Sequence, residues 1–372
     1  MAVVAFGKAL AVRDDGAMLL AGGVRGRALW TESANEKPLL LRRWVSARTS
    51  VDGGDGAYGA LLHAEGALVL TRAGGMSALD REQDATLPSC RASPVGERGR
   101  GYIDAGVRLG RMLSDTTAVL GGRRMQHVWL QDDGTSTVDT FFAGATSVCA
   151  MVVARGGATV AGTLGGALLR WDEGADRLGA SVPEAHPGVP RPDRGEDADR
   201  HDLHVCLRDH GLRGLAALRD GRVAAAGEQH LVLWDHRERR LEAVEMKPPF
   251  VGAHRACAAL DGMAVALVDA NRALWLWDVR SRTLGAAPVL PGEEVVEMSP
   301  DMQGRVLVAT KQGARRLDND MQIAYVSAEP CISVRASASG EHIVVHTGTE
   351  VHRNHVDPKT NVVRRKERVV TV

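Results

Sequence analysis

Three Trp-Asp pairs, each closing an apolar run, constrain the fold of this chain more than any other feature of its sequence. The pairs are Trp171-Asp172, Trp234-Asp235 and Trp277-Asp278. A glycine-containing turn precedes each pair, at residues 155–157, 220–221 and 261–262. Between this turn and the pair lie an apolar run ending in small residues and a second short turn. That order predicts a three-stranded antiparallel meander that recurs along the chain.

Weaker copies of the meander extend the repeat in both directions, with turns near residues 16, 66, 116, 304 and 340. A unit of ~40–45 residues that holds four strands is typical of a β-propeller. The fourth strands are expected at residues 39–45, 138–142 and 241–244. We therefore predict an all-β fold, a single β-propeller of eight four-stranded antiparallel blades, with seven blades as the alternative.

The whole chain, residues 1–372, is expected to form this one domain. Two stretches without strand periodicity, at about residues 81–101 and 183–210, are interpreted as insertions, because proline and mixed charge are typical of exposed loops. The terminal strands, Val3–Phe6 and Val362–Val372, are expected to close the ring by pairing in one blade. Closure would remove the exposed sheet edges that promote aggregation.

The unit resembles the WD-repeat family at residues 167–172, 231–235 and 274–278. This resemblance implies that the closing Trp lies on the third strand at a blade interface and that the Asp follows it. The Gly-His pair that usually opens such a unit is missing, so most of the family's polar tetrad is expected to be absent. Glycine doublets keep a kelch-type propeller open as an alternative, although three tyrosines are few for that family.

Charge and cysteine content narrow the functional classes. Lys plus Arg equals Asp plus Glu, 46 each, which argues against a general polyanion binder. Five widely spaced cysteines without a CxxC are interpreted as reduced thiols and predict a cytoplasmic or nuclear protein. No apolar stretch approaches the ~20 residues that span a bilayer, so no membrane partner is expected.

Motifs for catalysis are missing from the sequence, which has no GxSxG, HExxH or Walker-type loop. We therefore expect no enzyme activity, no catalytic residues and no cofactor. Two segments are rich in metal-ligating side chains, residues 201–210 and the group His342, His346, His352 and His355. We expect no metal at either, because His352 and His355 differ in strand parity and the first segment lacks a second Cys/His pair.

One motif favours a partner surface. Trp234-Asp235-His236-Arg237 and Trp277-Asp278-Val279-Arg280 share the pattern WDxR in successive units. Within the WD-repeat family, tandem WDxR resembles the signature of substrate receptors for cullin–RING ubiquitin ligases, where the Arg meets the linker protein. Arg237, Arg280 and His236 are therefore the predicted partner-binding residues, although an Arg that only follows a turn is the plainer interpretation.

The sequence thus predicts a non-enzymatic scaffold whose rim and channel mouth bind protein or peptide partners, within a multi-subunit complex. Two other hypotheses stay open. One is a propeller enzyme or small-ligand binder that uses His and Asp side chains at the channel mouth. The other is a nucleic-acid-associated propeller that uses the arginine-rich residues 81–100 and the basic run 364–368.

Overall fold

The structure is a computed structural model of the 372-residue chain. The residues that it describes are 9–22, 27–31, 39–41, 57–63, 66–71, 76–81, 90–94, 109–112, 117–121, 124–130, 136–143, 148–154, 158–164, 166, 168–171, 184–185, 212–227, 230–235, 237–238, 240–246, 250, 253–259, 263–285, 288–300, 304–318, 323–337, 339–357, 360 and 362–371.

The described residues form eight four-stranded antiparallel sheets, each built from strands that follow one another in the chain. The first sheet comprises β1 (Ala9–Val12), β2 (Met18–Gly22), β3 (Arg27–Thr31) and β4 (Leu39–Leu41). The second comprises β5 (Ala57–His63), β6 (Gly66–Thr71), β7 (Met76–Arg81) and β8 (Cys90–Pro94). The third comprises β9 (Leu109–Met112), β10 (Thr117–Gly121), β11 (Arg124–Leu130) and β12 (Ser136–Ala143). The fourth comprises β13 (Val148–Val153), β14 (Thr159–Thr163), β15 (Leu168–Trp171) and β16 (Glu184–Ala185).

The same meander continues through the second half of the chain. The fifth sheet comprises β17 (Leu212–Ala217), β18 (Val223–Gly227), β19 (His230–Asp235) and β20 (Arg240–Glu245). The sixth comprises β21 (Ala253–Ala259), β22 (Ala264–Asp269), β23 (Leu274–Asp278) and β24 (Thr283–Leu284). The seventh comprises β25 (Val295–Pro300), β26 (Val306–Thr310), β27 (Gly313–Leu317) and β28 (Ile323–Ser327). The eighth comprises β29 (Ser333–Ala336), β30 (His342–His346), β31 (Glu350–Val356) and β32 (Val363–Thr371).

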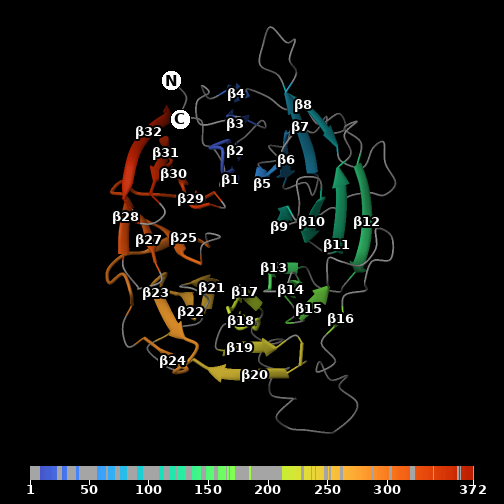
Figure 1. The fold of residues 1–372 in the computed structure, drawn as a ribbon, viewed down its shortest axis with the longest axis vertical. Coiled ribbons are helices and arrows are strands. Elements are labelled where there is room, and N and C mark those ends of the chain that lie inside the picture. Colours follow the sequence, from blue (N-terminus) through green and yellow to red (C-terminus); the bar gives the residue numbers. More distant parts are fainter. Residues whose placement is uncertain are drawn as a thin grey trace.

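The sheets are arranged around a common centre (Figure 1). The first strand of each sheet lies nearest the centre and the fourth lies at the periphery. First strands of successive sheets contact one another, and β29 of the last sheet contacts β1 of the first. The chain is therefore all-β and propeller-like, as its sequence predicts.

Burial on both faces explains why the second strands are continuous apolar runs. Every residue of β18, β22 and β26 is buried. Small and β-branched side chains suit these strands, because they fit between two closely packed sheets. Apolar clusters fill the spaces between the fourth and fifth, the fifth and sixth, the sixth and seventh, and the seventh and eighth sheets.

Asp-Gly pairs form the tight turns between the first and second strands of the first and fifth sheets. The carboxylate of Asp220 accepts a hydrogen bond from the backbone N–H of Arg222, at 3.0 Å. Gly221 follows with φ of +94°, a conformation that costs little only for glycine. Asp15 caps the turn of the first sheet in the same way by accepting a bond from Ala17 N–H. The turns predicted near residue 16 and at residues 220–221 are therefore confirmed, whereas residues 155–157 and 261–262 lie outside the described part of the chain.

The first and eighth sheets pack face to face. Leu10 and Met18 contact Val344 and Val351 in a small apolar cluster. Beside it, the guanidinium of Arg353 donates a 2.9 Å hydrogen bond to the carbonyl of Gly16. These contacts join segments that are far apart in the sequence.

Several expectations can be placed on these strands. The fourth strands expected at residues 39–45, 138–142 and 241–244 correspond to β4, β12 and β20. The structure assigns β8 within residues 81–101 and β16 within residues 183–210, so each of these stretches supplies an outer strand. At the chain ends, β32 pairs with β31, while residues 3–6 lie outside the described part.

Among the described residues, Cys149 and Cys331 are not joined in a disulfide. Across the ranges given above, no helix has the length and apolar character needed to cross a bilayer.

Candidate functional site

The two WDxR turns have the same backbone design in the fifth and sixth sheets. The Oδ1 atom of Asp235 accepts hydrogen bonds from the N–H groups of Arg237 and Glu238, at 3.0 and 3.1 Å. The Oδ1 atom of Asp278 accepts the equivalent bonds from Arg280 and Ser281, at 2.9 and 2.6 Å. A short acidic side chain after the Trp therefore fixes the turn into the fourth strand. These bonds lower the pKa of Asp278, that from the Ser281 N–H most strongly.

Both predicted arginines lie in these turns and are exposed. Arg237 is exposed, and its guanidinium lies 3.7 Å from the position that a Cβ on Gly221 would occupy. Arg280 is also exposed. Next to it, Arg282 forms a 2.7 Å salt bridge with Glu242 of β20, which ties the sixth sheet to the fifth at this edge. His236 and Asp172 lie outside the described residues, and Trp171 ends β15.

The Trp of each WD pair packs between sheets. Trp234 lies in the cluster between the fourth and fifth sheets, and Trp277 in the cluster between the fifth and sixth. The interface position implied by the family resemblance is confirmed for these two residues. Trp275 is an interface tryptophan that sequence reasoning missed. Its Nε1–H donates a 2.9 Å hydrogen bond to the buried carboxylate of Asp269, and its ring meets Phe250 edge to face.

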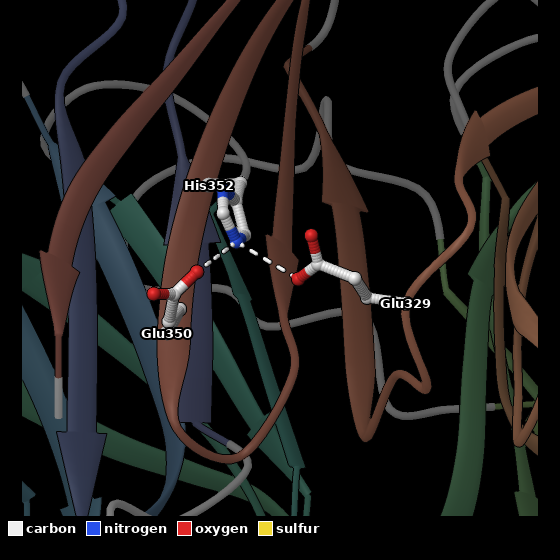
Figure 2. A group of neighbouring side chains, drawn as sticks. All are labelled: Glu329, Glu350 and His352. Atoms are coloured by element: carbon white, nitrogen blue, oxygen red, sulfur yellow. Dashed lines mark ion pairs between the residues drawn. The ribbon is translucent and has the colours of Figure 1, made fainter.

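A second group of side chains converges on the eighth sheet. Figure 2 shows Glu350 and His352 on β31 and Glu329 in the connection between β28 and β29. The Nε2 atom of His352 lies 2.9 Å from Oε2 of Glu350 and 3.2 Å from Oε2 of Glu329. The imidazole is buried, with 5% of its side chain exposed, whereas the side chain of Glu329 is 46% exposed. The group therefore opens to solvent on the Glu329 side. We call these three residues the Glu-Glu-His cluster.

Basic side chains of β32 hold the outer oxygens of both carboxylates. Lys366 Nζ lies 3.2 Å from Oε1 of Glu329, and Arg368 lies 3.2 Å from Oε1 of Glu350. The hydrogen bond from Lys366 is the main reason why the pKa of Glu329 is below its usual value. Each carboxylate thus has one oxygen fixed by a cation and the other directed at the imidazole.

The backbone around Glu329 is also anchored. The thiol of Cys331 donates a hydrogen bond to the Glu329 carbonyl, at 2.8 Å. Burial raises the pKa of Cys331 to about 12, so the residue remains a thiol in neutral solution. This buried anchor holds the connection against the eighth sheet.

The basic run 364–368 is paired with acidic groups in this region. Arg364 forms a salt bridge with Asp357, and Lys366 and Arg368 bind the two glutamates of the cluster. A run that is neutralised in this way is less available to bind phosphates.

The histidines of the eighth sheet fall into separate environments. The rings of His342 and His355 lie side by side, with centroids 5.3 Å apart. Neither residue belongs to the Glu-Glu-His cluster that contains His352. His346 is fully buried, and burial lowers its pKa to about 4. The prediction that parity separates His352 from His355 is confirmed. Residues 201–210 lie outside the described part of the chain.

Sequence reasoning passed over both glutamates of the Glu-Glu-His cluster. Glu350 and His352 are separated by one residue on a strand, a spacing that places both side chains on one face, and that local signal was available. No local sequence pattern marked Glu329, because only the fold brings the connection between β28 and β29 beside β31.

Comparisons with known proteins support the fold but show no specific function. No protein-family model matches the chain, and no curated protein matches it in sequence. Among solved structures, Sqt1 from Chaetomium thermophilum, a WD40 protein, is similar with a TM-score of 0.61 and 12% identity, over 92% of this chain and 94% of that one. The computationally designed protein Ika8 is similar with a TM-score of 0.57 and 11% identity, over 95% of this chain and 97% of that one. At such identities the likeness shows a β-propeller fold alone.

Proposed function

We propose that this chain is a divergent WD-repeat propeller that serves as a non-enzymatic scaffold for protein partners. In this proposal the eight sheets are eight blades, and the ring closes where the first sheet packs on the eighth. The partner surface is the edge that carries Arg237 and Arg280. Five widely spaced cysteines without a CxxC support a reducing compartment, cytoplasmic or nuclear.

One observation carries the proposal: the two WDxR turns repeat the same Asp-capped geometry on neighbouring sheets and present an exposed Arg from each. The turn fixes the backbone that carries each Arg, and the planar guanidinium suits carboxylate or carbonyl acceptors on a partner. The Arg282–Glu242 salt bridge supports a fixed spacing between the two turns. The tandem WDxR motifs resemble those of substrate receptors for cullin–RING ubiquitin ligases. This resemblance supports that more specific role for the chain.

Affinity purification with mass spectrometry tests the proposal. The tagged wild-type chain is compared with the double variant Arg237→Ala, Arg280→Ala, and with Arg364→Ala as a control that removes an exposed Arg from the eighth sheet. We expect at least one partner to be lost from the double variant and kept by the control. Recovery of a linker protein of cullin–RING ligases among the lost partners would support the receptor role. An identical set of partners for all three chains would rule out this edge as the docking surface.

Direct binding provides the second readout. A partner identified in this way, once purified, should bind the wild-type chain at least ~10-fold more tightly than the double variant, as is usual when interface arginines are removed. Circular dichroism must show that the variants fold as the wild type does. Equal affinity for the wild type and the double variant would count against the proposal.

A further inference from the structure

We propose that the Glu-Glu-His cluster is a binding site for one divalent transition cation, best matched to Zn²⁺, with Oε2 of Glu329, Oε2 of Glu350 and Nε2 of His352 as its protein ligands. These atoms all lie within 4.8 Å of one another. Two carboxylate oxygens and an imidazole nitrogen form a mixed O/N donor set. Such a set suits Zn²⁺ better than Mg²⁺ or Ca²⁺, which prefer oxygen ligands alone.

The distances fit the coordination geometry of zinc. Ligand atoms bound tetrahedrally at ~2.0–2.1 Å from zinc lie roughly 3.3 Å from one another. The Nε2 atom of His352 lies 2.9 and 3.2 Å from the two glutamate oxygens, so an ion could enter after small side-chain shifts. The fourth position would face solvent on the Glu329 side and take a water molecule.

The unmet hydrogen-bonding capacity of His352 is the independent observation that points to a ligand. His352 is 4% exposed, and neither of its ring nitrogens makes a hydrogen bond with any described residue. Its Nε2 faces both carboxylates, with which it forms ion pairs when the ring is protonated. Figure 2 shows the nitrogen directed between them. A buried polar atom without a hydrogen bond is costly, and a cation placed between the three groups would give Nε2 a partner.

The surroundings supply what a metal site needs beyond its ligands. Lys366 and Arg368 fix the outer oxygens of the two glutamates, so the inner oxygens keep their orientation. The connection that carries Glu329 joins the seventh sheet to the eighth, while Glu350 and His352 lie on β31. A bound ion would therefore fasten this connection to the eighth sheet.

Isothermal titration calorimetry with Zn²⁺ tests the proposal. The chain is purified through a tag without histidine, stripped with EDTA, dialysed, and kept reduced with a phosphine so that Cys149 and Cys331 stay as thiols. We expect one Zn²⁺ to bind per wild-type chain. Glu350→Gln and His352→Gln should each weaken binding at least ~10-fold, while Glu341→Gln, a matched change elsewhere in the eighth sheet, should leave it unchanged.

Thermal unfolding separates loss of the site from loss of the fold. Zn²⁺ should raise the Tm of the wild type and of Glu341→Gln but not that of Glu350→Gln. If a β31 variant does not fold, Glu329→Gln replaces it, because that side chain lies in a half-exposed connection. No stoichiometric binding by the wild type would overturn the proposal. Binding of unchanged strength in the glutamine variants would overturn it too, since the ion would then be held elsewhere.

Discussion

Two regions of the molecule are packed with different kinds of side chain. They are the interface between the fifth and sixth sheets and the buried face of the eighth sheet. The first interface is apolar, with Trp275 and Trp277 among aliphatic residues of both sheets. The eighth sheet buries His346, His352, Arg353 and other polar groups between its apolar residues. A four-stranded meander tolerates either solution. The difference teaches that the apolar interface depends on shape, whereas the eighth sheet depends on charge state and on hydrogen-bond partners.

Removing a ring from the apolar interface should have the largest effect. Trp277→Ala is expected to lower the free energy of unfolding by ~3–5 kcal/mol, because it leaves a large cavity among residues that cannot fully close it. Guanidinium unfolding followed by circular dichroism measures this. Trp277→Phe is the control. Since Trp277 Nε1 has no hydrogen bond among the described residues, most of the stability should survive. A loss as large for Phe as for Ala would contradict an interface that depends on shape.

Acid should destabilise the eighth sheet through His346. Burial lowers the pKa of His346 to about 4 in the folded chain, against 6.5 for an ordinary histidine. The unfolded state therefore binds a proton first, and the contribution of neutral His346 is complete above pH 6.5 and disappears as the pH falls to about 4. The expected loss is about 3 kcal/mol.

Urea unfolding at pH 7 and pH 4.5 measures the effect of acid, with His346→Leu as the control. That variant has no group to titrate at this position, so its stability should fall less between the two pH values. An equal fall in both chains would mean that His346 does not carry the acid sensitivity.

Replacing Arg353, which lies at the contact between the first and eighth sheets, should have an intermediate effect on the free energy of unfolding. It is buried, binds the Gly16 carbonyl and pairs with Glu367 at 2.9 Å. Arg353→Met should cost about 1–3 kcal/mol, because the carbonyl and the carboxylate lose their partner while Glu367, 38% exposed, regains water. Chemical unfolding measures the loss, and hydrogen exchange should rise in β2. Unchanged exchange there would show that Arg353 does not join the two sheets.

The smallest effects are expected at the WDxR turns. Arg237→Ala and Arg280→Ala should each change the free energy of unfolding by less than ~0.5 kcal/mol, because both residues are exposed and the Asp residues hold the turns. Differential scanning calorimetry would detect a larger change. A loss comparable to that of Trp277→Ala would mean that these arginines belong to the fold and would remove the reason to expect a partner at this edge.

The sequence predicted what repeats and missed what does not. Apolar runs closed by Trp234-Asp235 and Trp277-Asp278 carry their signal locally, so their strands, turns and interface positions could be predicted. The convergence of Glu329 with His352 could not, because 23 positions separate them in the chain and only the passage from one sheet to the next brings them together. Trp275 was hidden for another reason: within an apolar run, nothing distinguishes a tryptophan whose N–H has a buried acceptor such as Asp269.

Each described sheet draws all four of its strands from one uninterrupted stretch of sequence. Among the described residues, the first and eighth sheets meet through an apolar cluster, the Arg353–Gly16 hydrogen bond and a hydrogen bond from Ser339 N–H to Asp14. Cutting the chain in any connection between two described sheets would therefore break none of the described strand pairs. These connections are natural places to graft a reporter or a second binding module.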